Sequence, residues 1–234
     1  MLNSLTTKKD IRSFSISPEN FTGEKGKGGM STDGLAAGAA RDLGQGWKVN
    51  PYIYVEPGEA FTLADITGQG AIKHIWITGG LSRFIILRIY FDGQERPAVE
   101  APVSDFFANA DHTDYRQLSS LAICVNPLRG YNCYFEMPYF KSFRVELENI
   151  GTETAAVYYQ IDCEEKPIPK DSLYFHASFN RINPVPYKEP YVILDGIKGY
   201  ALENGFSPFT EPFHWPEITA LVHLQQSTVW VNSH

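Results

Sequence analysis

Between residues 52 and 194 the chain is a close succession of short apolar or alternating segments separated by turn residues, a pattern typical of β-strands. The clearest segment is Phe143–Glu148, where apolar and charged side chains alternate and one face is expected to be buried. Phe84–Phe91 is an apolar run with a single arginine inside it, and it ends at Asp92-Gly93, a strong hairpin signal. Strands and helices do not alternate, so a parallel sheet is disfavoured, and the predicted fold class is an all-β sandwich of the jelly-roll type.

About nine strands are predicted from this pattern, and almost no helix. They are Glu59–Ile66, Ala71–Thr78, Phe84–Phe91, Leu118–Val125, Tyr131–Met137, Phe143–Glu148, Val157–Asp162, Leu173–Ile182 and Tyr191–Leu194. Residues 1–50 are expected to form a Gly-rich loop, with one short helix over Gly34–Asp42 and Asp33 as its N-cap.

A composition break at Gly199 divides the chain. All 20 Lys and Arg residues precede it, and none lies in the 35 residues that follow (234 minus 199). We therefore predict three parts: residues 1–50 as the N-terminal loop and helix segment, 51–195 as the β-sandwich, and 196–234 as a divergent tail. Within the tail, Ala220–Val231 is suited to one further strand.

Charge and cysteine usage restrict the partners and the compartment. The formal net charge is −7 and the pI is about 5.4, which disfavours nucleic acid as a partner. No segment approaches the roughly 20 apolar residues of a spanning helix, so no membrane partner is predicted. Three cysteines without metal or framework spacing point to a reducing compartment. We expect a cytoplasmic protein that uses no cofactor and no metal.

Five residues are candidates for contact with a sugar. Trp47 stands in a loop, where an indole either stacks on a sugar ring or forms a lid over the sandwich. Asp105 and Phe107 begin a polar loop, and a carboxylate beside aromatic rings suits sugar hydroxyls, although Asp is also common at turns. His176 lies on a predicted strand, where core packing and pocket lining both stay open. Arg181 ends that strand and either binds a ligand or pairs with a surface acid.

Catalytic groups are harder to find in this sequence. Glycoside hydrolysis usually needs two carboxylates at a fixed separation. The local pairs Glu164-Glu165 and Glu146/Glu148 have the pattern of solvated surface, and no nucleophile, His and acid occur in a triad-like context. The loop Asp111–Asp114 holds three potential metal ligands, but a solvated polar loop explains it better.

Several motifs, taken in order, resemble a known family. They are Ser15-Ile-Ser17 with the Gly23–Gly29 loop, Ala40–Lys48, Glu56-Pro-Gly-Glu59, Gly70–Trp76, Asp105-Phe-Phe107, Gly130–Pro138, Tyr174-Phe-His-Ala177 and Tyr191–Gly199. Together they are similar to glycoside hydrolase family 172, first catalogued as domain of unknown function 2961. The resemblance runs from about Ser13 to Gly199.

The resemblance implies two jelly rolls in tandem, trimer-based homo-oligomers, and retaining hydrolysis of α-D-fructofuranosides or α-D-arabinofuranosides. Family members continue after Lys198-Gly199 into His-Tyr-Val-Gly, Gly-Glu-Gly-Glu and Gly-Thr-Glu-Asp motifs that supply the two catalytic glutamates. None of these motifs occurs here, so no catalytic residue is carried over. We expect the first jelly roll of a furanoside-acting protein, inactive as this chain, whose tail is a truncated or frameshifted start of the second jelly roll. The alternative is a non-catalytic carbohydrate-binding or oligomer-assembly module.

Overall fold

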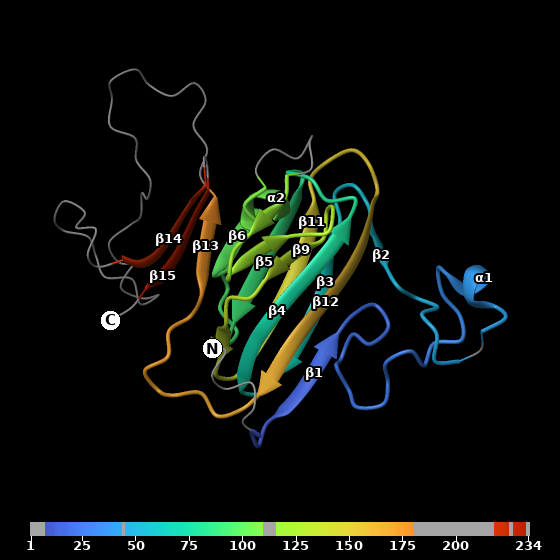
Figure 1. Cartoon of the computed structure of the whole chain (residues 1–234), viewed down its shortest axis with the longest axis horizontal. Helices are drawn as coiled ribbons and strands as arrows, with labels where there is room; N and C mark the ends of the chain where they lie inside the picture. The colour runs from blue at the N-terminus through green and yellow to red at the C-terminus, as the bar shows by residue number, and fades with distance from the viewer. Residues whose placement is uncertain (1–7, 44, 110–115, 180–217, 225–226, 233–234) are drawn as a thin grey trace.

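The computed structural model describes residues 8–43, 45–109, 116–179, 218–224 and 227–232. In these residues two β-sheets stack face to face (Figure 1). Helix in the described residues is confined to α1 (Ala37–Ala40) and α2 (Val103–Phe106). The predicted all-β sandwich is therefore confirmed.

The first sheet contains eight strands in the order β1-β12-β4-β9-β8-β7, with β2 beside β12 and β10 beside β4. Its strands are β1 (Arg12–Ile16), β2 (Ile53–Val55), β4 (Gly70–Gly79), β7 (Leu118–Ser119), β8 (Ile123–Val125), β9 (Tyr131–Cys133), β10 (Met137–Tyr139) and β12 (Ala155–Glu165).

The second sheet contains seven strands in the order β14-β15-β13-β6-β5-β11-β3. Its strands are β3 (Ala60–Thr67), β5 (Ile85–Phe91), β6 (Val99–Pro102), β11 (Ser142–Asn149), β13 (His176–Phe179), β14 (Ile218–Leu224) and β15 (Ser227–Asn232). Strand β1 is an edge of the first sheet and β3 an edge of the second.

The core lies between the sheets and follows from the alternation in the sequence. On β5 and β11 every second side chain is buried, and on β12 the same period holds over ten residues, from Ala155 to Glu164. Burying one Ile, Leu or Phe side chain contributes about 1.5–3 kcal/mol, so these faces hold the two sheets together. The side chains between these buried ones point outward and form the outer face of each sheet, where polar groups gather.

The N-terminal 50 residues differ from the prediction in two ways. Arg12–Ile16, expected as loop, is strand β1, which pairs with β12 along its whole length. Its mostly exposed, polar side chains hid the strand from a search for apolar runs. Asp33 is not the N-cap of the helix: α1 begins after Ala36, and the Asp33 carboxylate accepts the adjacent Gly34 N–H instead.

Other predicted strands were placed correctly but divided wrongly. Leu118–Val125 is a hairpin, β7 and β8, because the Ser120 side chain bonds the backbone of residues 122 and 123 and turns the chain. Tyr131–Met137 is likewise split between β9 and β10. Strand β6, which was not predicted, pairs parallel with β13.

The tail contributes two strands rather than one. Strands β14 and β15 form an antiparallel hairpin, and β15 pairs with β13 at that end of the second sheet. The strand predicted at Tyr191–Leu194, the loop Asp111–Asp114 and most of the tail lie outside the described residues. Among the cysteines, Cys133 and Cys163 are buried, and burial raises the pKa of the Cys133 thiol to about 12.

Candidate functional site

A buried ion pair anchors the most developed polar site on the second sheet. Asp105, on α2, has no solvent exposure, and its two carboxylate oxygens accept from Arg83 Nε at 2.9 Å and Nη2 at 2.7 Å. The Ser104 hydroxyl donates to the same carboxylate at 3.1 Å. Such a two-pronged arginine–carboxylate bond fixes the guanidinium plane as well as neutralising the buried charge.

Arg83 lines a pocket of about 490 Å³ on the outer face of β5, β6 and β13, called here the Arg83 pocket. Ile86, Ile150 and Phe179 supply apolar surface, and Arg88 and Glu100 supply charge. Arg88 bonds Glu148 at 2.6 Å and Glu100 at 3.4 Å. Burial lowers the pKa of Arg88, but these two carboxylates outweigh it and the pKa is raised overall. The pocket therefore combines fixed cations, acceptors and an apolar wall.

Asp105 and Phe107, two predicted sugar contacts, are fully buried. Phe107 packs on Phe106 and on Tyr131, with ring centroids 4.9 Å and 5.5 Å away. Buried side chains do not contact a ligand directly in this conformation, so their substrate role stays a prediction. Asp105 nevertheless reaches the Arg83 pocket through its guanidinium partner.

Of the remaining three predicted residues, the structure describes His176 and Trp47. His176, on β13, is largely buried, and burial lowers its pKa to about 4, so it is neutral at pH 7. Trp47 is 54% exposed in the segment between α1 and β2, which projects from the sandwich on the side away from β13 (Figure 1). Arg181 lies outside the described residues, two positions after Phe179 of the Arg83 pocket.

Sequence patterns did not single out Arg83, the residue that links the pocket to Asp105. It precedes a strand and belongs to no motif, and its partner Asp105 is 22 residues away. Arg88 left a signal, since it is the one charged residue inside the apolar run of β5. A charge within such a run must face outward or be paired, and here it does both.

The chain matches the family model described as the GH172 first beta-sandwich domain over residues 29–189, more than half of its length. The chain belongs to the GH172 family. No curated protein matches it. The matched range contains the Arg83 pocket and every strand from β2 to β13, so the GH172 domain covers most of the observed sandwich.

In this GH172 sandwich the acidic pairs considered for catalysis are held by cations. Glu164 bonds Lys166 at 3.0 Å, and Glu165 bonds Arg12 at 2.7 Å. Ion pairs also hold the other two glutamates, Glu146 with Arg144 at 2.8 Å and Glu148 with Arg88 at 2.6 Å. Neighbouring strand residues also point to opposite faces, which separates Glu164 from Glu165. These carboxylates are surface ion pairs rather than an acid and a nucleophile arranged about one bond.

A histidine network occupies the outer face of the first sheet of the GH172 domain. His74 Nδ1 lies 2.9 Å from Asp162 Oδ2, and Nε2 lies 3.1 Å from Asn132 Oδ1. The Asn132 amide nitrogen faces backbone carbonyls of Gly130 and Cys124, at 3.1 and 3.3 Å, which fixes its oxygen toward His74. Both imidazole nitrogens therefore donate, which requires the protonated ring.

The charged form of His74 follows from these contacts. Burial lowers its pKa, but the hydrogen bonds to Asp162 and Asn132 outweigh burial, and the pKa is raised. The Tyr134 ring stacks on the imidazole, with centroids 4.6 Å apart and planes 4° apart. The network connects side chains of β4, β9 and β12 on this face of the sheet.

Within the described ranges, no group of three or more His, Cys, Asp and Glu side chains is placed to hold a metal ion. No helix in those same ranges is long and apolar enough to cross a membrane.

Proposed function

We propose that this chain is the first jelly roll of a GH172 glycoside hydrolase acting on α-D-fructofuranosides or α-D-arabinofuranosides. In this proposal it supplies substrate-side groups and does not hydrolyse the substrate by itself. The family match over residues 29–189 supports the hydrolase family. The absence of the two glutamate motifs from the sequence supports the lack of hydrolysis.

The fixed guanidinium of Arg83 is the observation that supports a substrate-side role. Simple furanosides are neutral, and their small ring carries several hydroxyls that both donate and accept hydrogen bonds. Arg83 offers donors in a set plane, Glu100 offers acceptors, and the Ile86 and Phe179 side chains offer an apolar surface for ring carbons. Pockets for small ligands combine these features, a mostly apolar wall with a few placed polar groups.

The five predicted sugar-contacting residues have different roles in this proposal. Trp47 is exposed enough to stack on a sugar directly. Asp105 acts by holding Arg83, and His176 and Phe107 shape the strand and helix beside the pocket. Arg181 lies outside the described residues, and its contact with a sugar stays a prediction.

Binding and turnover of furanosides test this proposal together. The purified chain should bind methyl α-D-arabinofuranoside or methyl α-D-fructofuranoside, and should release no p-nitrophenol from p-nitrophenyl α-D-arabinofuranoside. Arg83→Lys keeps the charge but loses the two-pronged bond, so affinity should fall about tenfold. Arg41→Lys, at an exposed pair with Asp42, is the matched control and should bind normally. Hydrolysis by the chain, or no binding of either furanoside, would overturn the proposal.

Assembly into trimer-based homo-oligomers in the cytoplasm is the second part of the proposal. Support comes from the described part of residues 17–50, which exposes several large apolar side chains. They are Phe21, Met30, Leu35, Leu43 and Trp47, each 40–54% exposed. Exposed apolar surface of this kind commonly marks association sites. Sedimentation velocity should show a trimer or a multiple of it, and a monomer at every concentration would contradict this part.

A non-catalytic binding or assembly module is the alternative, favoured by the ion pairing of all four candidate glutamates. The hydrolase and module hypotheses predict different effects of adding a second GH172 sandwich to this chain. If a separately produced second GH172 sandwich restores furanoside hydrolysis when mixed with this chain, the hydrolase hypothesis holds. If the mixture binds furanosides without turnover, the module hypothesis replaces it.

A further inference from the structure

A second pocket, of about 380 Å³, lies where the two sheets meet at their edges, and we call it the Tyr139 pocket. It is lined from one side by β1, the edge of the first sheet, and from the other by β3, the edge of the second. Arg12 and Glu165 face each other across the β1–β12 pair and bond at 2.7 Å at its mouth. This pocket is separate from the Arg83 pocket, with which it shares no residue.

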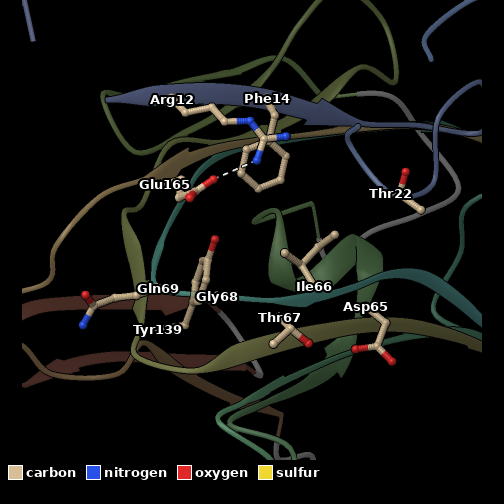
Figure 2. A pocket seen from close by; sticks show the side chains of 10 residues that line it. All are labelled: Arg12, Phe14, Thr22, Asp65, Ile66, Thr67, Gly68, Gln69, Tyr139 and Glu165. Atoms are coloured by element: carbon tan, nitrogen blue, oxygen red, sulfur yellow. Dashed lines mark hydrogen bonds and ion pairs between the residues drawn. The ribbon is translucent and has the colours of Figure 1, made fainter. Parts of the chain in front are cut away.

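The Tyr139 hydroxyl is the feature that points to a ligand. The Tyr139 residue is only 1% exposed, and its ring packs on Phe143 with centroids 4.8 Å apart. Figure 2 shows the hydroxyl pointing into the pocket, toward the Arg12–Glu165 pair. It makes no hydrogen bond to any other residue of the described chain. Its oxygen is not among the fully buried, unpaired side-chain atoms of the described residues, so it is open to the pocket and can bond a ligand there.

The strand opposite Tyr139 is built to make room for this hydroxyl. Gly70 is the cross-strand neighbour of both Tyr139 and Glu165. A Cβ at Gly70 would lie 2.8 Å from the Tyr139 hydroxyl oxygen, so any larger residue would displace the phenol. The pocket therefore depends on a glycine at this position.

Charge in the Tyr139 pocket disfavours an anionic ligand. The charges of Arg12 and Glu165 cancel, and Asp65 at the rim adds one negative charge, so the sum is −1 and anions are disfavoured. Arg12 and Thr22 offer donors, and Glu165 offers acceptors. Phe14 and Ile66 supply apolar surface between them (Figure 2). Donors, acceptors and an apolar wall in one small space match a polyol ring.

We propose that the Tyr139 pocket binds one neutral monosaccharide ring through the Tyr139 hydroxyl and the Arg12–Glu165 pair. The choice of a sugar rests on the proposed carbohydrate function, whereas the pocket itself rests on its own geometry. It is a second carbohydrate site, distant from the groups proposed to contact a furanoside at Arg83. Its volume lies within the usual range for small-molecule sites, about 300–1,000 Å³.

Titration of the ¹⁵N-labelled chain with D-fructose and D-arabinose tests this proposal by NMR. Amide signals of Ile66, Thr67 and Gly68 should shift and saturate with at least one sugar. Tyr139→Phe keeps the ring and removes the hydroxyl, so affinity should fall roughly fivefold, the equivalent of one hydrogen bond. Inorganic phosphate should produce no saturating shift at these amides.

Tyr159→Phe is the matched control. The Tyr159 hydroxyl is also buried, but it donates to the Leu63 carbonyl at 2.8 Å, away from the pocket. This variant should bind sugar as the unaltered chain does. Unchanged binding by Tyr139→Phe, absence of sugar-dependent shifts, or tighter binding of phosphate would each overturn the proposal. Failure of the proposed function would give a different result. Amide signals near the Arg83 pocket would then not shift when a furanoside is added, whereas those near the Tyr139 pocket would still shift when a sugar is added.

Discussion

The Tyr174 hydroxyl donates to the Asp92 carboxylate at 2.6 Å and joins three distant parts of the chain. The same carboxylate accepts backbone N–H groups of Phe140, Lys141 and Ser142, in the turn between β10 and β11. Asp92 itself follows β5, and Tyr174 precedes β13. The Asp92 side chain therefore connects the end of β5, the turn between β10 and β11, and the segment that leads into β13.

Replacing Asp92 with Asn should destabilise the fold. Hydrogen bonds to a charged acceptor are stronger than neutral ones, so the free energy of unfolding at pH 7 should fall by about 2 kcal/mol. Burial raises the pKa of Asp92, but the bonds from Tyr174 and the three N–H groups outweigh it and the pKa is lowered. The stabilisation is therefore present above the ordinary pKa of 3.8 and is lost as the pH falls through the lowered value.

Urea unfolding of the Asp92→Asn variant at several pH values measures this effect. The difference between the variant and the unaltered chain should shrink in acid, because the variant lacks the titrating carboxylate. Asp33→Asn is the control, since the Asp33 carboxylate has one described bond, to the next residue in the chain. A constant difference from pH 7 to pH 2 would contradict the assignment.

Asp92 also illustrates what the sequence can and cannot reveal. Asp92-Gly93 was predicted as a turn because both residues adopt positive φ easily, and they do so, at 54° and 78°. The bonding partners of the carboxylate lie 48 to 82 residues away along the chain. Local patterns predict turns and strands well, but such distant partners are set by the packing of the sheets.

The candidate site also depends on contacts between residues that are distant in the sequence. Asp105 was singled out for its loop position, but its burial and its bond to Arg83 depend on where α2 packs. Tyr139 follows a proline in the sequence, and nothing around it indicated a hydroxyl that faces a pocket. The strand pairing that brings Gly70, Glu165 and Arg12 to one edge determines that pocket.

Protonation of His74 should stabilise the fold. Its pKa is raised because the hydrogen bonds to Asp162 and Asn132 outweigh burial, which acts the other way. The stabilisation is complete below the ordinary pKa of 6.5 and is lost as the pH rises through the raised value. NMR titration of the His74 ring protons should give a pKa above 6.5. Asp162→Asn should lower that pKa, and an unchanged value would show that the pair is not coupled.

Gly70→Ala should be strongly destabilising. The new methyl group would overlap the backbone oxygen of Glu164 and press on the Tyr139 hydroxyl, so the central pair β4–β12 must separate locally. Overpacking of this kind costs about 1–3 kcal/mol or more. Gly38→Ala is the control, because nothing lies within 4 Å of its new methyl group and alanine favours the helix α1. Thermal unfolding should show a lower Tm for Gly70→Ala alone, and equal values would refute the close contact.

The Arg83–Asp105 pair should show strong coupling in a double-mutant cycle. Arg83→Met leaves the fully buried Asp105 carboxylate without its guanidinium, and losing one partner of a buried pair costs about 3–5 kcal/mol. Asp105→Leu in the same chain removes the buried charge, so the double variant should be more stable than Arg83→Met alone. Urea unfolding of the two single variants and the double variant gives the coupling energy. Strictly additive losses would mean that the two side chains act independently, and that Asp105 does not hold Arg83 in place for a ligand.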